Sequence, residues 1–251
     1  MLITVIVTAY NRAGLLPIAV RSLIRQRQDA NLDILIVDDG STDETHRLFK
    51  DLASEYGGLR YIWQDNAGIA AARNTGLLGL LPETEVVTFL DSDDASPEGR
   101  FAADLPHLLA DPNLDLTYGK LRMVSMIDPI TMAPPHGSSY REVCGPQLSL
   151  GLFRRRVIER TGMFDPELRQ AEDIDFLLRM FETGAQFLQT ETITLYYRRH
   201  LGNITANKSD MQRYIALALL RSSKRRRADP TKVFRKPNFE LSPQVLLEDK
   251  C

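Results

Sequence analysis

The sequence predicts an α/β fold in which a mostly parallel sheet carries helices on both faces. Through residue 90, short apolar runs alternate with longer segments of helical periodicity, and this alternation is typical of successive β-α-β units. The fourth apolar run, residues 86–90, is rich in β-branched residues, as expected of a strand buried on both faces. Polar, acidic loops follow the first, second and fourth runs, at the strand ends where open α/β sheets bind ligands.

Hydrophobic periodicity and turn residues define the elements of the N-terminal half. The segment 15–26 places apolar side chains on one face at helical spacing. The helix after the second strand has Ser41 or Thr42 near its start and two glycines just past its end. In order, the predicted elements are strand 2–7, helix 15–26, strand 32–37, helix 43–56, strand 59–64, helix 66–80 and strand 86–90.

The C-terminal half continues with shorter elements. The segment 126–140 contains three prolines and a glycine, so we interpret it as a loop, either a flap near a site or a surface loop. The basic run 224–227 favours the C-terminal end of a helix through the macrodipole, or marks a patch for an anionic membrane or acceptor. The predicted elements are helix 101–109, strand 114–121, helix 157–161, helix 174–182, one long strand or a strand pair over 187–197, and helix 209–221.

Composition excludes several classes of protein. The formal net charge is −2 at pH 7, so no overall basic field suggests nucleic acid as a partner. Cys144 and Cys251 are the only cysteines, which argues against a disulfide framework or a structural zinc site. The N-terminus lacks a basic leader and a cleavage site, and no apolar run reaches the roughly 18 residues of a membrane helix. We therefore expect a soluble, cytoplasmic protein.

Three carboxylates end the fourth predicted strand. Asp91, Asp93 and Asp94 lie within four residues, and carboxylates packed so closely repel one another unless a cation lies between them. Oxygen-rich sites of this kind suit Mg²⁺ or Mn²⁺. The alternative is that Asp93 or Asp94 caps a helix that begins near Pro97.

Six segments carry a resemblance to a known family when they are taken together and in order. They are 7–12 (VTAYNR), 37–43 (VDDGSTD), 66–76 (NAGIAAARNTG), 90–94 (LDSDD), 162–165 (GMFD) and 172–175 (EDID). Together they resemble the inverting family 2 glycosyltransferases of the GT-A fold, and the resemblance covers residues 2 to 203. It implies a Rossmann-like, mostly parallel sheet. It also implies metal-dependent transfer of one sugar, with inversion, from a nucleotide-sugar donor (a UDP-sugar) to an acceptor hydroxyl.

The resemblance assigns the donor-binding roles to five residues. Thr8, Tyr10 and Asp39 would form the nucleoside pocket, in which Asp39 accepts a hydrogen bond from uracil N3–H. Asn66 would hydrogen-bond nearby, and Arg73 would reach the diphosphate through paired N–H donors. From the residues alone, Asp39 could equally be a turn aspartate and Arg73 part of a solvated helix face.

The segment Asp91-Ser92-Asp93 resembles the DxD motif of the family. Asp91, with Ser92 beside it, would contact the ribose or donor sugar, and Asp93 would bind a Mg²⁺ or Mn²⁺ ion that bridges the diphosphate. Such ions typically use one or two carboxylates plus substrate phosphates. His200 resembles a late histidine that joins the metal shell in some members, although a lone histidine is as often without such a role.

The resemblance makes Asp173 the catalytic base and Glu172 the residue that orients the base or the acceptor. Inverting displacement needs one base opposite the leaving group, to take the proton of the acceptor hydroxyl. The cation would stabilise the departing diphosphate. The alternative is that both acids only favour the N-terminus of their helix.

The predicted domain organisation is one GT-A domain over 1–205, followed by a C-terminal helix and tail over 206–251. The nucleotide-sugar half would end at about residue 120 and the acceptor half would span 121–205. The acceptor would be a glycan, lipid-linked or other hydroxyl compound, with either no membrane contact or a peripheral one at the cytoplasmic face. A non-catalytic nucleotide-sugar-binding or scaffold protein remains the alternative. A phosphoacceptor receiver domain is disfavoured, because the acidic pair follows the second strand rather than the first.

Overall fold

The computed structural model describes residues 1–199, 208–229 and 234–240. Their strands form an 8-stranded sheet in the order β3-β2-β1-β4-β7-β5-β6, with β8 paired to β5. In chain order the elements are β1 (Leu2–Ala9), α1 (Leu16–Ile24), β2 (Asn31–Asp38), α2 (Thr45–Tyr56), β3 (Leu59–Trp63), α3 (Ile69–Leu78), β4 (Thr84–Asp91), α4 (Arg100–Ala110), β5 (Leu116–Val124), β6 (Arg141–Val143), the 3₁₀ turn η1 (Leu148–Leu150), β7 (Gly151–Arg154), α5 (Arg155–Thr161), α6 (Glu172–Glu182), β8 (Phe187–Arg198) and α7 (Lys208–Ala228).

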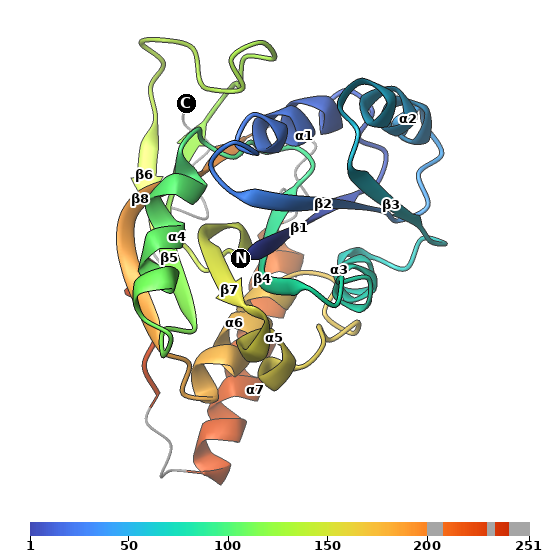
Figure 1. The fold of residues 1–251 in the computed structure, drawn as a ribbon. Coiled ribbons are helices and arrows are strands. Elements are labelled where there is room, and N and C mark those ends of the chain that lie inside the picture. The colour runs from blue at the N-terminus through green and yellow to red at the C-terminus, as the bar shows by residue number, and fades with distance from the viewer. Residues whose placement is uncertain (200–207, 230–233, 241–251) are drawn as a thin grey trace.

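The first four strands are parallel, as the sequence predicts. β1 pairs with β2 on one side and with β4 on the other, and β3 extends the sheet beyond β2. Residues 3–9 of β1 are all buried, so both faces of this strand are covered. Figure 1 shows how: α1 and α2 lie on one side of these strands and α3 on the other. The parallel arrangement brings the carboxyl ends of β1, β2 and β4 to one edge.

The second half of the sheet is mixed. β7 runs antiparallel between β4 and β5, β6 is antiparallel to β5, and β8 is parallel to β5. The sequence did not reveal β7, because a four-residue strand is too short to show a periodicity. The segment 187–197 is one long strand, which settles the alternative left open. β8 joins this half to the first through an isolated bridge between Tyr196 and Ala95, just after β4.

One C-terminal helix is longer than expected, and the predicted loop 126–140 is confirmed as a loop. α7 extends to Ala228 instead of ending near residue 221, so the basic run lies within its last turn. Lysine and arginine are good helix formers, and no glycine or proline interrupts this segment before Pro230. The loop 126–140 contains no helix or strand, and Arg25 tethers it by donating to the carbonyl of Thr131 at 2.6 Å. Among the described residues, no helix has the length and apolar content needed to cross a membrane.

Candidate active site

The carboxyl ends of three parallel strands place predicted site residues next to one another. Thr8 of β1 lies opposite Asp91 of β4 and opposite Val37 of β2 in the strand registers. The backbone N–H of Asp39 donates to the carbonyl of Ala9 at 2.8 Å, which holds the turn after β2 against the end of β1. The sheet therefore brings Thr8, Asp39 and Asp91 to one edge.

Asp39 anchors the loop that leads into α3. Its Oδ1 accepts from Gln64 Nε2 at 2.6 Å and from the N–H of Ala67 at 3.0 Å, while its Oδ2 accepts from the N–H of Gly68 at 2.9 Å. Each carboxylate oxygen can accept two hydrogen bonds, so these three donors leave Oδ2 able to accept one more. Asp39 is thus more than a turn aspartate, because it fixes a second loop at the strand ends.

Asn66 completes this contact between the two loops. Its Nδ2 donates to the carbonyl of Asp39 at 2.9 Å. Gly40 has φ +77°, and a Cβ at this position would lie 2.7 Å from the backbone nitrogen of Asn66. Only glycine fits there, since the left-handed conformation and the close approach both exclude a side chain. Tyr10 lies on the neighbouring loop with 46% of its surface exposed, so its ring is accessible at this edge.

The acidic segment after β4 makes a second set of contacts. Arg12 Nε lies 4.0 Å from Asp93 Oδ2. From the end of β8, Arg198 donates its backbone N–H to Asp94 Oδ1 and its Nε to the carbonyl of Asp93, both at 2.8 Å. Burial, followed by the charges of Asp93 and Asp91, raises the pKa of Asp94 well above its usual range. Three carboxylates therefore repel one another here, as the sequence suggested.

The helix-capping alternative for these acids is wrong. α4 begins only at Arg100, its N-cap is Gly99, and no side chain caps it. Asp93 and Asp94 instead contact Arg198 of β8. Ser92 is buried between the outer acids of the motif. His200, predicted to join a metal shell, lies outside the described residues.

Arg73 joins the two halves of the site. Its Nη2 donates to Asp91 Oδ1 at 3.1 Å, and its Nη1 is ion-paired with Glu172 of α6. The side chain also lies over the ring of Phe164, 5.7 Å from the centroid. Arg73 is only 4% exposed, so the solvated-face alternative is wrong. Burial would lower its pKa, but the charges of Glu172, Asp91 and Asp173 outweigh that effect and raise it.

Glu172 and Asp173 occupy the first turn of α6. Asp173 is partly exposed, and its Oδ1 accepts from the N–H of Ile174 at 2.8 Å. Burial among protein atoms, together with the charge of Glu172, raises the pKa of Asp173 to about 7, against the opposing pull of Arg73. A carboxylate with this pKa can exchange a proton near neutral pH, as general acid–base chemistry requires.

Tyr118 of β5 brings a further loop to this region. Its hydroxyl contacts the carbonyls of Gly145 and Gln147, each at 2.8 Å, and accepts from the N–H of Gln147 at 2.9 Å. Burial raises the pKa of Tyr118 well above its usual range, and the charge of Asp173 adds to this effect. Tyr118 thereby holds residues 145–147, which lie in the half of the chain expected to bind the acceptor.

The structure adds three residues to the predicted site. Gln64 holds Asp39, while Arg12 and Arg198 contact Asp93. Arg12 lies inside a segment that carried the resemblance, so its position was a usable signal. Gln64 and Arg198 could not be recognised locally, because each contacts its partner across the sheet.

The described residues contain no group of three or more His, Cys, Asp or Glu side chains arranged to hold a metal ion. Asp91 and Asp93 nevertheless supply the oxygen donors that Mg²⁺ and Mn²⁺ prefer. Beside them lies Asp94, whose pKa is raised mainly by burial and further by the charges of Asp93 and Asp91. Such ions commonly use one or two carboxylates together with substrate phosphates. The donor set therefore fits a divalent cation that shares its coordination with a bound diphosphate.

Comparison with known proteins places this geometry in a family. A family model described as "Glycosyl transferase family 2" matches residues 4–142. The uncharacterized glycosyltransferase EpsJ of Bacillus subtilis (strain 168) is 27% identical over 222 residues, which are 81% of this chain and 63% of EpsJ. WfaP of Escherichia coli, a UDP-Glc:alpha-D-GlcNAc-diphosphoundecaprenol beta-1,3-glucosyltransferase, is 26% identical over 216 residues, 82% of this chain and 81% of WfaP. The chain thus spans less than two thirds of the length of EpsJ.

Solved structures share the fold. Staphylococcus aureus TarS 1-349 in complex with UDP-GlcNAc superposes with a TM-score of 0.68 at 18% identity, covering 88% of this chain and 66% of TarS 1-349. The mannosyltransferase PcManGT from Pyrobaculum calidifontis, in complex with GDP-Man and Mn²⁺, gives 0.66 at 21% identity, covering 88% and 64%. The expected GT-A fold is confirmed. Because the family model matches more than half of the sequence, this chain belongs to glycosyl transferase family 2.

Proposed function

We propose that the protein is a metal-dependent, inverting glycosyltransferase that moves one sugar from a UDP-sugar to an acceptor hydroxyl. The observation that carries the proposal is the chain of contacts Asp91–Arg73–Glu172. It connects the acidic strand end expected to bind the donor with Asp173, a carboxylate whose pKa is raised to about 7. A protein that only bound nucleotide sugars would need no such group beside its binding site.

On the donor side, Asp39 would accept the uracil N3–H through the remaining capacity of Oδ2, while Tyr10 would lie along the base. Thr8 and Asn66 would line the same pocket. Support comes from the position of all four residues at the ends of β1 and β2 or on the loop that Asp39 anchors. TarS 1-349, which shares the fold, has been solved in complex with UDP-GlcNAc and with UDP.

A Mg²⁺ or Mn²⁺ ion would be held by Asp93, with Asp91 beside it, and would require the diphosphate as a further ligand. When bound, it would neutralise charge on the leaving diphosphate. Arg12 would add positive charge beside Asp93, since its Nε lies 4.0 Å from that carboxylate. Arg73 would act on Asp91 and Glu172; its predicted direct contact with the diphosphate remains a proposal.

Asp173 would remove the proton of the acceptor hydroxyl as that oxygen attacks the anomeric carbon from the side opposite the diphosphate. One displacement of this kind inverts the anomeric configuration. The raised pKa suits this task, because a base with a proton affinity close to the operating pH transfers protons most effectively. Glu172, fixed by Arg73, would keep Asp173 and the acceptor oriented.

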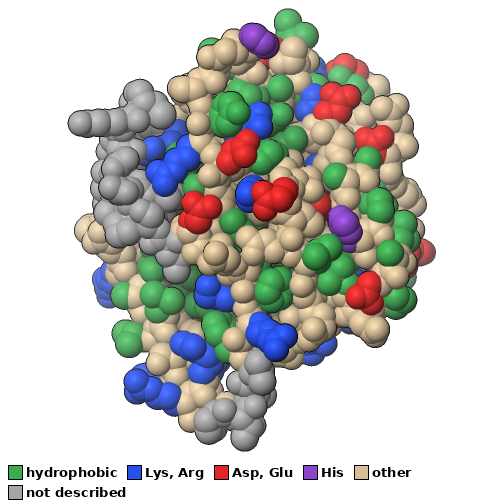
Figure 2. Space-filling view, turned by 90° about the vertical axis from the view of Figure 1, so that its left-hand side faces the viewer, with side chains coloured by type: hydrophobic (Ala, Val, Ile, Leu, Met, Phe, Trp, Pro, Cys, Tyr) green, Lys and Arg blue, Asp and Glu red, His purple; other side chains and the backbone are tan. Residues whose placement is uncertain are grey.

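The acceptor would carry its hydroxyl next to Asp173, and a lipid-linked glycan is the acceptor class we favour. WfaP, whose name describes a diphosphoundecaprenol-linked acceptor, supports this choice. Figure 2 shows that Lys and Arg side chains gather toward the lower end of its face, away from most of the acidic ones, at the height where α7 ends in Figure 1. Exposed Lys224, Arg226 and Arg227 lie on this last part of α7, so we propose a peripheral contact with anionic lipid at the cytoplasmic face.

The experiment is a screen of nucleotide sugars for thermal stabilisation and for transfer to polyprenyl-diphosphate-linked sugars, with Mn²⁺, with Mg²⁺ and with EDTA. We expect one UDP-sugar to raise the melting temperature and to be consumed only when the cation is present. A GDP-sugar or CDP-sugar preference would contradict the uridine assignment. Stabilisation by a UDP-sugar without turnover, across all acceptors, would favour the non-catalytic alternative.

A further inference from the structure

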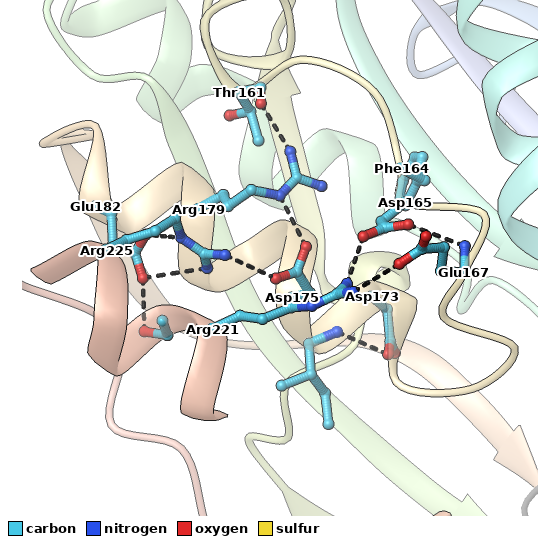
Figure 3. A network of polar contacts seen from close by, with 12 residues as sticks. Thr161, Phe164, Asp165, Glu167, Asp173, Asp175, Arg179, Glu182, Arg221 and Arg225 are labelled. Carbon is cyan, nitrogen blue, oxygen red and sulfur yellow. Dashed lines mark hydrogen bonds and ion pairs between the residues drawn. The ribbon is translucent and has the colours of Figure 1, made fainter. Parts of the chain in front are cut away.

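The inner face of α7 carries a network of charged side chains that the proposed reaction does not use (Figure 3). At its centre is Asp175 of α6, whose side chain is 3% exposed. Asp175 accepts from Arg179 Nε at 2.8 Å and from Arg225 Nη1 of α7 at 3.2 Å. The same Arg225 donates through Nε to Glu182 at 2.6 Å.

Arg225 thereby ties two points of α6 to α7. Asp175 and Glu182 are seven residues apart, about two helical turns, and one guanidinium contacts both. Ser222 adds a hydrogen bond to Glu182 at 2.5 Å, and Arg179 donates to the carbonyl of Thr161 at 2.8 Å. Charge-assisted hydrogen bonds of this kind are short and directional, so rotation or sliding of α6 would break several of them at once.

α7 also holds the loop that leads into α6. Arg221 forms ion pairs with Asp165 and Glu167 of this loop. The neighbouring Phe164 stacks on Phe176 of α6 with ring centroids 4.1 Å apart. Arg73 of the candidate site lies over the ring of the same Phe164. The loop is therefore fixed between α7 and the site.

The residue directly before Glu172 is held in an unfavourable conformation. Ala171 has φ 58° and ψ 20°, which lies in the left-handed region that residues with a Cβ rarely adopt. Such a conformation persists only where the surrounding structure enforces it. Ala171 is buried in a small apolar cluster with Ile174, Leu178 and Ala218 of α7. α7 therefore covers the backbone turn that directs Glu172 and Asp173 toward the site.

We infer that Arg221 and Arg225 of α7 are positioning residues, which hold the loop 162–171 and α6 so that Ala171 keeps its left-handed conformation and Asp173 faces the acceptor. The inference rests on the proposed function in one respect, the role of Asp173 as the base. It concerns the rate of transfer and not the binding of the donor, because Arg221 and Arg225 pair with acids of α6 and of the loop before it, namely Asp165, Glu167, Asp175 and Glu182.

The first test compares Arg225→Gln, Arg225→Lys and the control Arg213→Gln, an exposed position on the same helix. For Arg225→Gln we expect kcat to fall about 100-fold, since a displacement of about 1 Å at a reacting group has that effect. The donor KM and the UDP dissociation constant should stay within about twofold of the parent values. Arg225→Lys should recover part of kcat, and Arg213→Gln should match the parent.

The second test adds Ala171→Gly to Arg225→Gln. Glycine adopts positive φ readily, so it should keep the turn without support from α7 and restore kcat at least about fivefold. Because glycine at this position relieves strain and can also stabilise the fold, kcat is measured per folded molecule. A network that served only global stability would leave the kcat of folded Arg225→Gln unchanged. If Arg225→Gln fails to fold, Arg221→Gln tests the inference instead. The ion pairs of Arg221 are partly exposed and contribute little to stability, so this variant should fold, and we expect its kcat to fall several-fold.

Three results would overturn the inference: unchanged kcat in Arg225→Gln, unchanged kcat in Arg221→Gln, or no recovery with Ala171→Gly. A fall in UDP affinity equal to the fall in kcat would also overturn it, since the network would then act on the donor. Failure of the proposed function is visible separately, because it would appear as full activity in Asp173→Asn whatever the α7 variants do.

Discussion

The carboxylate proposed to bind the donor, Asp39, and the carboxylate proposed as the base, Asp173, lie in differently built surroundings. Asp39 is fixed mainly by backbone N–H groups of the short loop 64–68, next to the strand end that carries it. The acids close to Asp173 in the chain are held by side chains from distant segments: Glu172 pairs with Arg73 of α3, and Asp165 and Asp175 pair with arginines of α7. Under the proposed function, donor recognition would be built into the parallel sheet, whereas the base would be positioned by ion pairs over long sequence separations. Substitutions should separate these two dependences.

Removal of the proposed metal ligand should have the largest effect on the donor side. In Asp93→Ala we expect UDP affinity measured with Mn²⁺ to fall roughly 100-fold, the loss of charge-assisted contacts to the diphosphate. Affinity measured in EDTA should change little. Because the diphosphate completes the proposed coordination, Mn²⁺ alone should bind weakly to the parent and tightly in the presence of UDP. Calorimetry that finds an equal loss with and without the cation would remove Asp93 from the metal site.

Asp39→Ala should weaken UDP binding roughly tenfold and reduce the preference for UDP over CDP. Cytosine has no N3–H to donate, so the preference depends on the proposed acceptor. The matched control is Gln64→Leu, which removes one donor to Asp39 but keeps the carboxylate. Equal loss of UDP affinity in both variants, with unchanged selectivity, would mean that Asp39 acts only by holding the loop.

The pH dependence of kcat/KM tests the base side. If Asp173 must be deprotonated, activity should rise with pH through an apparent pKa of about 7. In Glu172→Gln the negative neighbour is lost and Arg73 is released from its ion pair, and both changes favour the charged form of Asp173. The acid limb of the kcat/KM profile should shift toward lower pH by about one pH unit, even if kcat falls. An acid limb that stays in place or shifts toward higher pH would contradict the electrostatic coupling between Glu172 and Asp173.

A smaller effect should appear in stability. The pKa of Asp173 is raised in the fold above its unfolded value, so its contribution to stability is present below about pH 4 and is lost as pH rises through 7. Asp173→Asn removes this loss, and we expect the free energy of unfolding at pH 8 to increase by about 1 kcal/mol or more. Denaturant titrations at pH 5 and pH 8 measure it; an equal change at both would show that the charge is not responsible.

The sequence predicted the strand-end positions of Asp39 and Asp91 better than the partners of Arg73 and Arg225, and the contacts explain why. The strands before Asp39 and Asp91 are continuous apolar runs, so local periodicity placed both acids at strand ends. Arg73 was expected on the diphosphate, and its burial between Asp91 and Glu172 depends on a partner 99 residues away. Arg225 was part of a basic run interpreted as a solvated helix end or an anionic patch. In the structure it faces Asp175 and Glu182, a pairing that no local pattern encodes.

The arginines 154–156 are a second case in which the local sequence does not reveal the partners of charged side chains. From the sequence alone, this run could contact an anionic acceptor or form a solvated helix start. The structure gives them another role: Arg154 donates to the carbonyl of Leu114 at 2.8 Å, and Arg156 pairs with Asp115 at 2.8 Å. These side chains join α5 to the start of β5. Charge alone did not reveal this, because the acceptors are buried groups some 40 residues earlier in the chain.

Transfer by Asp173→Asn, measured alongside UDP binding, tests the central claim most directly. Asparagine keeps the shape of the side chain but cannot accept a proton at neutral pH. The account predicts that the rate of sugar transfer falls at least about 1,000-fold, while the UDP dissociation constant with Mn²⁺ stays within about twofold. Transfer at a tenth or more of the parental rate, or a loss of UDP binding as large as the loss of transfer, would show that the base lies elsewhere.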